Sequence, residues 1–243
     1  MKEWFLSLAD GFSQTFIESD RWVLFAKGFG VTIRVAVLAL LMGIAIGILV
    51  AIVRTKHDTK KKNAHGFGNV ILNILNAICQ VYLTVIRGTP TMVQLLIVFY
   101  VIFATIDPGK IVVAIIAFGM NSAAYVAEIV RSGIMSIDQG QFEAGRSLGL
   151  NYTQTMIKII LPQAVKNILP ALGNELIVLL KETSISGYIG LMDLTRGGDI
   201  IRSQTYSALF PLLVVAAIYL VIVCFLTYLV GRLERRLRTN ERK

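Results

Sequence analysis

The sequence predicts an all-α membrane protein, a polytopic bundle of five membrane-spanning helices. Of its 243 residues, 55% are hydrophobic and 16% are charged, and the mean hydropathy is +0.68. This composition is typical of multi-span membrane proteins and not of soluble domains. The 24 Lys and Arg residues lie in short patches between long apolar runs. The net charge of +9 therefore indicates orientation in a membrane rather than binding to nucleic acid.

The first 27 residues are expected to form an external segment that lies on the membrane surface. Up to Asp20 they carry more acidic than basic side chains. Five apolar side chains fall near one helical face: Trp4, Phe5, Leu8, Phe12 and Phe16. An amphipathic helix of this kind lies in the membrane interface and does not cross it. The segment lacks the apolar core of a signal peptide, so none is expected here.

The first long apolar run, Val31–Val53, predicts the first membrane span. Its 23 residues include only two polar ones, and at about 1.5 Å per residue the run can cross a hydrocarbon core of about 30 Å. Gly43 and Gly47 form a GxxxG pair inside it, a pattern that marks close helix packing in some membrane proteins. Residues 54–62 then carry five Lys or Arg against one Asp. They are expected in the cytoplasm, which puts the N-terminus outside.

The next segment, Asn69–Ile86, is apolar but has a polar face. Four amide side chains repeat at i, i+4, i+7 and i+11: Asn69, Asn73, Asn76 and Gln80. This spacing predicts an amphipathic helix at the cytoplasmic surface. Counting the segment as a further span would move the later basic patches to the outside. The glycine and proline within residues 87–90 are expected to bend the chain into the next span.

Four further apolar stretches complete the five predicted spans: Thr91–Ile106, Ile111–Val130, Val165–Thr183 and Ser207–Val230. The turn at residues 107–110 and the charged loop Ser184–Tyr206 are then external. The tail from residue 231 holds six basic and two acidic residues and falls on the cytoplasmic side, as the positive-inside rule requires. We therefore expect a multi-pass cell-membrane protein with its N-terminus outside and its C-terminus in the cytoplasm. Its expected parts are the external segment 1–27, a transmembrane domain 28–236 and a tail 237–243.

The longest polar segment between apolar ones, residues 136–162, predicts two short helices joined by a glycine turn. Asp138 with Gln141 has the spacing of a capping box, and Gly149 stands where a left-handed helix end is needed. The first helix, Gln139–Leu148, is expected to dock on another protein through a small and apolar face. That face is predicted to contain Phe142, Gly145 and Leu148.

A second start signal, Asn151 with Gln154, predicts another helix that Pro162 interrupts. The whole segment resembles the EAA loop of ATP-binding-cassette importer permeases, whose pattern is E-A-A, three residues, G, nine residues, I-x-L-P. Gly145 replaces the second alanine, and the fitting positions are Glu143, Ala144, Gly149, Ile159, Leu161 and Pro162. The resemblance implies that residues 136–162 form a cytoplasmic coupling loop. The residues implied in coupling to the ATPase are Glu143, Ala144, Gly145, Leu148 and Gly149.

The resemblance extends over most of the chain, from about Phe25 to Arg236. The stretches VIRGTPTMVQLL, NSAAYVAEIVRSGI, LPQAVKNILPALGNELIVLLKETSI and RLERRLR are similar to those of the polar amino-acid uptake permeases, which have five spans per subunit. This implies a permease subunit, not itself an enzyme, that works with ATP-binding cassette ATPase subunits, an extracytoplasmic amino-acid-binding protein and a second permease copy, identical or related. No GxxxxGK(S/T) motif occurs in the chain, so ATP is expected on the partner subunit. We expect no cofactor and no metal on this chain.

Polar side chains inside the expected spans predict the substrate path, because such groups cost free energy in a bilayer unless they face a cavity or a partner. They are Gln94 on the second span, Asn121, Tyr125 and Glu128 along one face of the third, and Asn167, Asn174, Glu175, Lys181 and Glu182 on the fourth. Hydrogen bonds that only hold the bundle together are the alternative, and this alternative is as strong as the first for Asn167 and Gln94.

Glu175 is the best candidate for reading the substrate side chain. Lys181 lies six residues away, about 120° around the helix, so direct pairing is not expected and a cationic ligand is a reasonable partner. In the related permeases this position tends to be acidic where basic amino acids are carried and amide-like where neutral ones are. That resemblance implies a permease for arginine, lysine or histidine. The other residues expected at the substrate are Asn121, Tyr125, Gln94, Lys181, Thr183 and Ser184.

Several alternatives stay open at this point. Glu128 could read the side chain in place of Glu175, although Arg131, three residues on, indicates a structural ion pair. The substrate could be glutamine or another neutral polar amino acid. An ion-driven secondary transporter would use both acids as a relay, and transport without any ATPase subunit would favour it. A Ser-His hydrolase in the bilayer is excluded, because both histidines lie in the basic loop and no span holds one.

Overall fold

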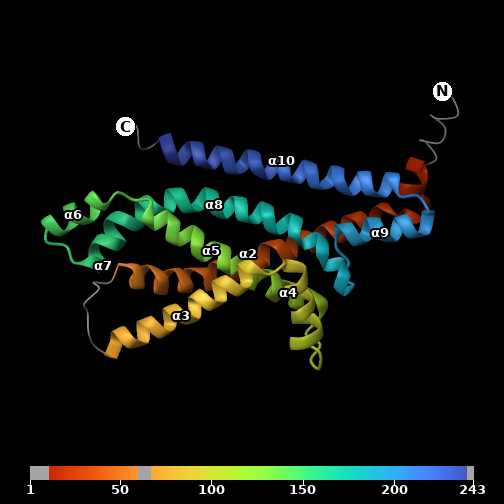
Figure 1. Ribbon diagram of the computed structural model, residues 1–243. Helices are drawn as coiled ribbons and strands as arrows, with labels where there is room; N and C mark the ends of the chain where they lie inside the picture. The colour runs from red at the N-terminus through yellow and green to blue at the C-terminus, as the bar shows by residue number, and fades with distance from the viewer. Residues whose placement is uncertain (1–10, 60–66, 240–243) are drawn as a thin grey trace. The chain divides into compact units, whose positions relative to one another are not determined.

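The structure of the chain, a computed structural model, describes residues 11–59 and 67–239 (Figure 1). Within these ranges all regular structure is helical, as the sequence predicts. The elements are η1 (Glu18–Asp20), α2 (Trp22–Asp58), α3 (Phe67–Gly88), α4 (Thr91–Ile97), η2 (Val98–Ile102), α5 (Lys110–Met135), α6 (Gln139–Ser147), α7 (Tyr152–Thr155), η3 (Met156–Ile160), α8 (Leu161–Glu182), η4 (Thr183–Ile189), α9 (Leu194–Thr205) and α10 (Leu209–Thr239).

The chain divides into two compact units that share its longest helices. The first unit comprises Met1–Ala39, Thr91–Phe118 and Ile177–Leu226, and the second comprises Leu40–Pro90, Gly119–Leu176 and Thr227–Lys243. Four described helices are long and apolar enough to cross a membrane, namely Glu18–Asp58, Phe67–Gly88, Lys110–Met135 and Leu209–Leu237. The predicted first and third spans lie within α2 and α5, the fifth matches α10 except for its first two residues, and the fourth corresponds to the 22-residue helix α8.

The prediction for the second span was wrong in its division of the chain. Residues 91–102 form only a short apolar helix, about 18 Å long, which is less than a bilayer core. The preceding helix α3 has the length and hydropathy of a span. The amide spacing predicts a polar face, yet Asn76 is 5% exposed and accepts a hydrogen bond of 3.1 Å from Arg54 Nη1. This asparagine therefore faces protein, and the polar stripe does not require a surface helix.

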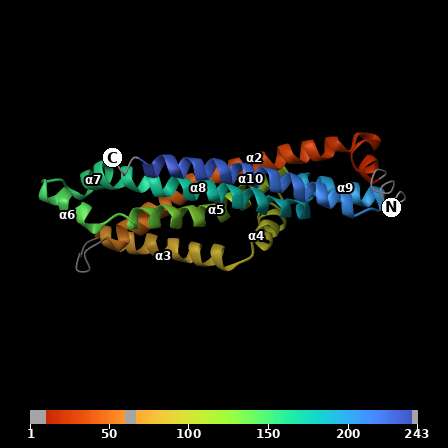
Figure 2. The ribbon, with the colours of Figure 1, turned by 90° about the horizontal axis from the view of Figure 1, so that it is seen from above.

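In the first unit, α9 packs beside the first turns of α2 and of α10 (Figure 2). The core of this contact consists of Phe25, Leu194, Ile201 and Val215. A Cβ atom on Gly28 would lie 2.5 Å from the carbonyl oxygen of Asp193, so the α2 backbone runs close to the start of α9. The predicted external loop Ser184–Tyr206 is thus wrong as a loop, because η4 and α9 occupy most of it.

The N-terminal aromatic residues also belong partly to this core. Phe16 packs against it, with its ring 5.8 Å from that of Phe25, whereas Phe12 is 52% exposed. The other three apolar residues of the predicted surface helix, Trp4, Phe5 and Leu8, lie outside the described residues.

In the second unit, the part of α2 that follows Ala39 packs against α5 through Gly43 and Gly47. A Cβ atom on Gly43 would lie 2.9 Å from the Ser122 hydroxyl, and one on Gly47 would lie 2.8 Å from the Val126 side chain. These approaches are closer than any other residue permits, so the close packing that the GxxxG spacing indicates is confirmed. The pair thereby fixes the position of Ser122.

Candidate functional site

The segment that resembles the EAA loop folds in the second unit as the sequence predicts, into two short helices and a glycine turn. Asp138 caps α6 by accepting a hydrogen bond of 2.7 Å from the Gly140 N–H, and Gly149 has φ +78°. Asn151 and Gln154 form the complete capping box at the start of α7. Figure 1 shows α6 and α7 beyond the adjoining ends of α5 and α8. The hairpin is therefore defined by its own caps and by its own turn.

Three details of this hairpin differ from the prediction. The Gln141 side chain makes no capping box and instead accepts a hydrogen bond from Gln163 at 3.4 Å. Pro162 does not end a helix, because the π-helical turn η3 leads directly into α8. The residues Phe142, Gly145 and Leu148 do not share one face.

The face of α6 splits because six residues rotate a helix to about 120° short of two full turns. Phe142 packs into the core formed by Ile134, Ile160, Ala164 and Ile168, while Leu148 is 77% exposed. A Cβ atom on Gly145 would lie 2.6 Å from the Thr155 side chain. Gly145 therefore lets α6 approach α7, and the exposed surface of the hairpin holds Glu143, Ala144 and Leu148 instead.

Tyr152 connects the hairpin to the end of α2. Its hydroxyl lies 3.3 Å from Thr59 Oγ1, and its ring stacks on Phe142 with centroids 6.2 Å apart. The hairpin is therefore in side-chain contact with the end of α2 and is continuous with α8 through η3.

Glu175, on α8 in the second unit, lies against α5. The residue is 8% exposed, and its Oε1 accepts a hydrogen bond of 2.8 Å from the Ser122 hydroxyl. Among the described residues of this unit, Ser122 is its hydrogen-bond partner, and no basic side chain makes an ion pair with it. The arrangement is a buried carboxylate with a neutral donor on one oxygen.

The polar face of α5 is divided between buried and open positions. Asn121 is 2% exposed, whereas Tyr125 is 37% exposed and carries the Arg87 guanidinium 5.6 Å from its ring centre. Glu128 pairs with Arg131 at 2.6 Å, so the predicted ion pair is confirmed. Asn167 donates to the Ser136 hydroxyl at 2.9 Å, which supports its structural alternative. Ser122 and Arg87 were absent from the prediction.

The remaining predicted site residues belong to the first unit. Thr183 is buried, and its hydroxyl donates to the Leu180 carbonyl at 2.8 Å, so it is engaged by its own helix. Gln94 and Ser184 are half-buried and Lys181 is exposed. Among the described residues, no group of three or more His, Cys, Asp or Glu side chains could hold a metal ion.

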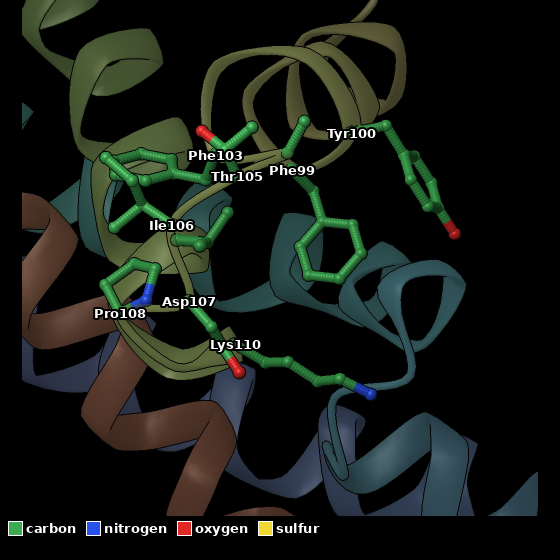
Figure 3. Close-up of a pocket in the computed structure, with 10 residues that line it drawn as sticks. Phe99, Tyr100, Phe103, Thr105, Ile106, Asp107, Pro108 and Lys110 are labelled. Atoms are coloured by element: carbon green, nitrogen blue, oxygen red, sulfur yellow. The ribbon is translucent and has the colours of Figure 1, made fainter.

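A hollow of about 380 Å³ in the first unit was not predicted from the sequence. It is lined mainly by aromatic and apolar side chains from η2 and the turn that follows (Figure 3), including Phe99, Tyr100, Phe103 and Ile106. Lys110 crosses one edge and donates to the Gly190 carbonyl at 3.2 Å. This bond joins the start of α5 to the turn between η4 and α9.

Comparison with known proteins places this geometry in a family. The family model described as "Binding-protein-dependent transport system inner membrane component" matches residues 66–239. The chain belongs to this family. The permease is therefore a membrane component of an importer and not itself an enzyme, and the family implies an ATPase and a substrate-binding partner. The resemblance to the polar amino-acid uptake permeases is confirmed.

Relatives and solved structures match this chain over nearly its whole length. The arginine transport system permease protein ArtQ of Bacillus subtilis is 37% identical over 217 residues, which is 88% of this chain and 93% of ArtQ. The glutamine transport system permease protein GlnP of Escherichia coli is 36% identical over 218 residues, with the same two shares.

The chain matches a crystal structure of an amino acid ABC transporter with histidines at 40% identity and a TM-score of 0.77. The match covers 88% of this chain and 94% of the chain in that structure. The MetNI methionine ABC transporter, at 20% identity and a TM-score of 0.76, covers 91% and 99%; this likeness supports the fold alone.

Proposed function

We propose that the permease moves polar amino acids inward in an ATP-driven importer and that basic ones, arginine, lysine and histidine, are its preferred substrates. The environment of the buried Glu175 carboxylate is the observation that supports this proposal. A carboxylate buried among helices needs a cation or several donors to offset its lost hydration. Within its unit the described residues give it one neutral donor, Ser122. A cationic substrate side chain supplies the missing charge.

Glutamine is the second candidate substrate, because relatives named for glutamine match the chain as closely as the relative named for arginine. A glutamine amide can donate one hydrogen bond to the free Glu175 oxygen. It brings no charge to offset that of a buried carboxylate, and for this reason we place it second.

The substrate head group is assigned in this proposal to residues near Glu175 and near the end of α8. Asn121 and Tyr125, on the same helix as Ser122, offer an amide and a hydroxyl. Gln94, Lys181, Thr183 and Ser184, which belong to the first unit, stay predictions for the substrate path.

The coupling step is assigned to the hairpin of α6 and α7. Two ATPase subunits would each hold one hairpin through its exposed residues Glu143, Ala144 and Leu148, and Gly149 sets the angle between the helices. Their closure would tilt the spans and open the path outward, and relaxation after hydrolysis would open it inward. Packed helices move as rigid units in transitions of this kind. A second permease copy, identical or related, completes the path.

The orientation that we propose puts the N-terminus outside and the C-terminus in the cytoplasm. If α3 and α4 together make one crossing, the permease has five crossings, and both the hairpin and the basic tail lie in the cytoplasm. The η4–α9 region is then external, and an extracytoplasmic binding protein would deliver the amino acid there.

Uptake of labelled arginine by the complete complex in liposomes tests the assignment of Glu175. We expect ATP-dependent uptake that lysine and histidine compete for better than glutamine. Glu175→Gln should abolish that preference, because a charge-assisted hydrogen bond contributes roughly 1.5–3 kcal/mol, about tenfold or more in affinity. Glu18→Gln, the same change at an exposed residue of η1, is the control. A preference that survives Glu175→Gln would transfer selection to the binding protein or to Glu128.

A further inference from the structure

A second polar site lies in the second unit, between α2, α3 and α5. It is a groove of about 400 Å³, within the size range of small-molecule sites, which is roughly 300–1,000 Å³. Its walls carry two guanidinium groups, one carboxylate and two neutral polar groups. The lining residues are Arg54, Gln80, Leu83, Thr84, Arg87 and Glu128.

Arg54 is held in place but not fully hydrogen-bonded. Its Nη1 donates to Asn76 Oδ1 at 3.1 Å, and this bond orients the guanidinium plane. Its Nε is buried and has no hydrogen-bond partner among the described residues. A buried N–H without an acceptor is destabilising, so an acceptor at this guanidinium would stabilise the site.

Arg87 presents a second guanidinium to the same groove. Its Cζ atom lies over the Tyr125 ring, 5.6 Å from the ring centre. A cation–π contact of this kind does not occupy the N–H donors of the guanidinium. Two guanidiniums that line one groove form a fork suited to a carboxylate.

Glu128 gives the groove its selectivity for a ligand with both charges. Its two oxygens accept from Arg131 at 2.6 Å and 3.3 Å, and Arg131 also lies 3.4 Å from Asp58. The Glu128 carboxylate is therefore fixed at the wall. It attracts an ammonium group and makes the groove less favourable for a dianion such as phosphate than the two guanidiniums alone would.

We propose that this groove binds the head group of an α-amino acid. The α-carboxylate bridges Arg54 and Arg87, and the α-ammonium group faces Glu128. The site is indifferent to the amino-acid side chain, whereas Glu175 reads that side chain. The identification of the ligand as the transported amino acid rests on the proposed function. Ser122 and Glu128 are six residues apart on α5, about 9 Å along the helix, so an amino acid that leaves Glu175 has a second site nearby.

Equilibrium binding of labelled L-arginine to the full-length permease, purified with its ATPase subunits, tests this site. Agmatine lacks the carboxylate and L-alanine lacks the cationic side chain, so each competes for one site only. We expect two classes of bound arginine per permease chain, one displaced by agmatine and one by L-alanine. Glu175→Gln should remove the first class and leave the second.

Arg87→Gln should weaken the alanine-sensitive class at least about tenfold, the loss expected for a charge-assisted hydrogen bond. Arg54→Lys keeps the charge but removes the planar guanidinium and its several N–H donors, so it should weaken the same class even if Arg87→Gln does not fold. Arg232→Gln, the same loss of charge at an exposed position, is the matched control.

Three results would overturn the site: no displacement by L-alanine, displacement by inorganic phosphate as strong as by L-alanine, or unchanged binding in Arg54→Lys. If the Glu175 assignment fails instead, the binding result is different: only the agmatine-sensitive class of arginine is missing, and the alanine-sensitive class remains.

Discussion

At the scale of residues, Glu128 on α5 and Glu175 on α8 are held by two different kinds of contact. The Glu128–Arg131 pair follows from the i, i+3 spacing of one helix. Ser122 and Glu175 come from helices 53 positions apart in sequence, and no local spacing relates them. The glycine pair in α2 positions Ser122 by contact, which is a property of packing between helices. For this reason the sequence identified the acid but not its donor.

Ser122→Ala is the residue change that isolates this donor. The Glu175 carboxylate loses the bond that fixes its orientation, and a ligand-reading group needs that support. We expect roughly tenfold weaker binding of arginine, which corresponds to about 1.4 kcal/mol, with the fold kept because a small buried side chain is exchanged for another. Equilibrium binding of labelled arginine measures the change.

Ser132→Ala is the control for that experiment, since the Ser132 hydroxyl donates only to the Ile129 carbonyl of its own helix at 3.1 Å. Equal arginine affinity in Ser122→Ala and in the unmodified chain would show that the hydroxyl does not orient the carboxylate.

At the scale of elements, caps and turns were predictable, whereas the environment of a helix face was not. Asp138, Gly149 and the Asn151–Gln154 box act within a few residues of themselves, and all occur where expected. The amides of α3 indicate a polar face, but periodicity cannot tell water from a neighbouring arginine. Asn76 meets Arg54, so this position of the face is turned toward protein, whereas Asn73 and Gln80 are exposed.

Gly149→Val tests the turn between α6 and α7. A β-branched residue is strained at φ +78°, while open space around this position excludes a steric clash as the cause. We expect ATP hydrolysis by the complete complex to continue and transport to fall, because the hairpin no longer holds its angle. The measured quantity is the ratio of amino acid transported to ATP hydrolysed.

Gly149→Asn is the matched variant, since asparagine tolerates the left-handed region far better than valine. It should keep most of the coupling. If Gly149→Val transports as much per ATP as the unmodified chain, the turn has no part in coupling.

At the scale of the whole molecule, hydropathy and charge predicted the class of fold and most of its helices. The spans in α2, α5 and α10 coincide with long apolar runs, which reflect the bilayer and need no knowledge of tertiary contacts. The helix α8 carries several polar side chains and is not among the four described helices that are apolar enough to cross a membrane. Two predictions were wrong: the division of the chain between α3 and α4, and the loop at Ser184–Tyr206. The second depends on packing, because Leu194 at the start of α9 is buried and its N–H donates to the Thr32 hydroxyl at 3.1 Å.

The orientation of the chain is a prediction about the whole molecule. In a variant with Cys79→Ser and Cys224→Ser, a single cysteine is placed at Gln14 or at Arg236, both exposed positions. A membrane-impermeant maleimide should label Gln14→Cys in intact cells and Arg236→Cys only after permeabilisation, because basic segments stay inside. Labelling of Arg236→Cys in intact cells would reverse the orientation and place the hairpin outside.

The π-helical turn η3 determines how the hairpin of α6 and α7 is rotated around the axis of α8. From Tyr152 to Glu182 the chain is one unbroken helical path, and the Leu161 N–H closes the wider turn on the Met156 carbonyl. A π turn holds one residue more than an α turn, and one residue corresponds to about 100° of rotation. Loss of a single residue between 156 and 160 would therefore keep the helix intact but rotate the hairpin by about 100° around the axis of α8.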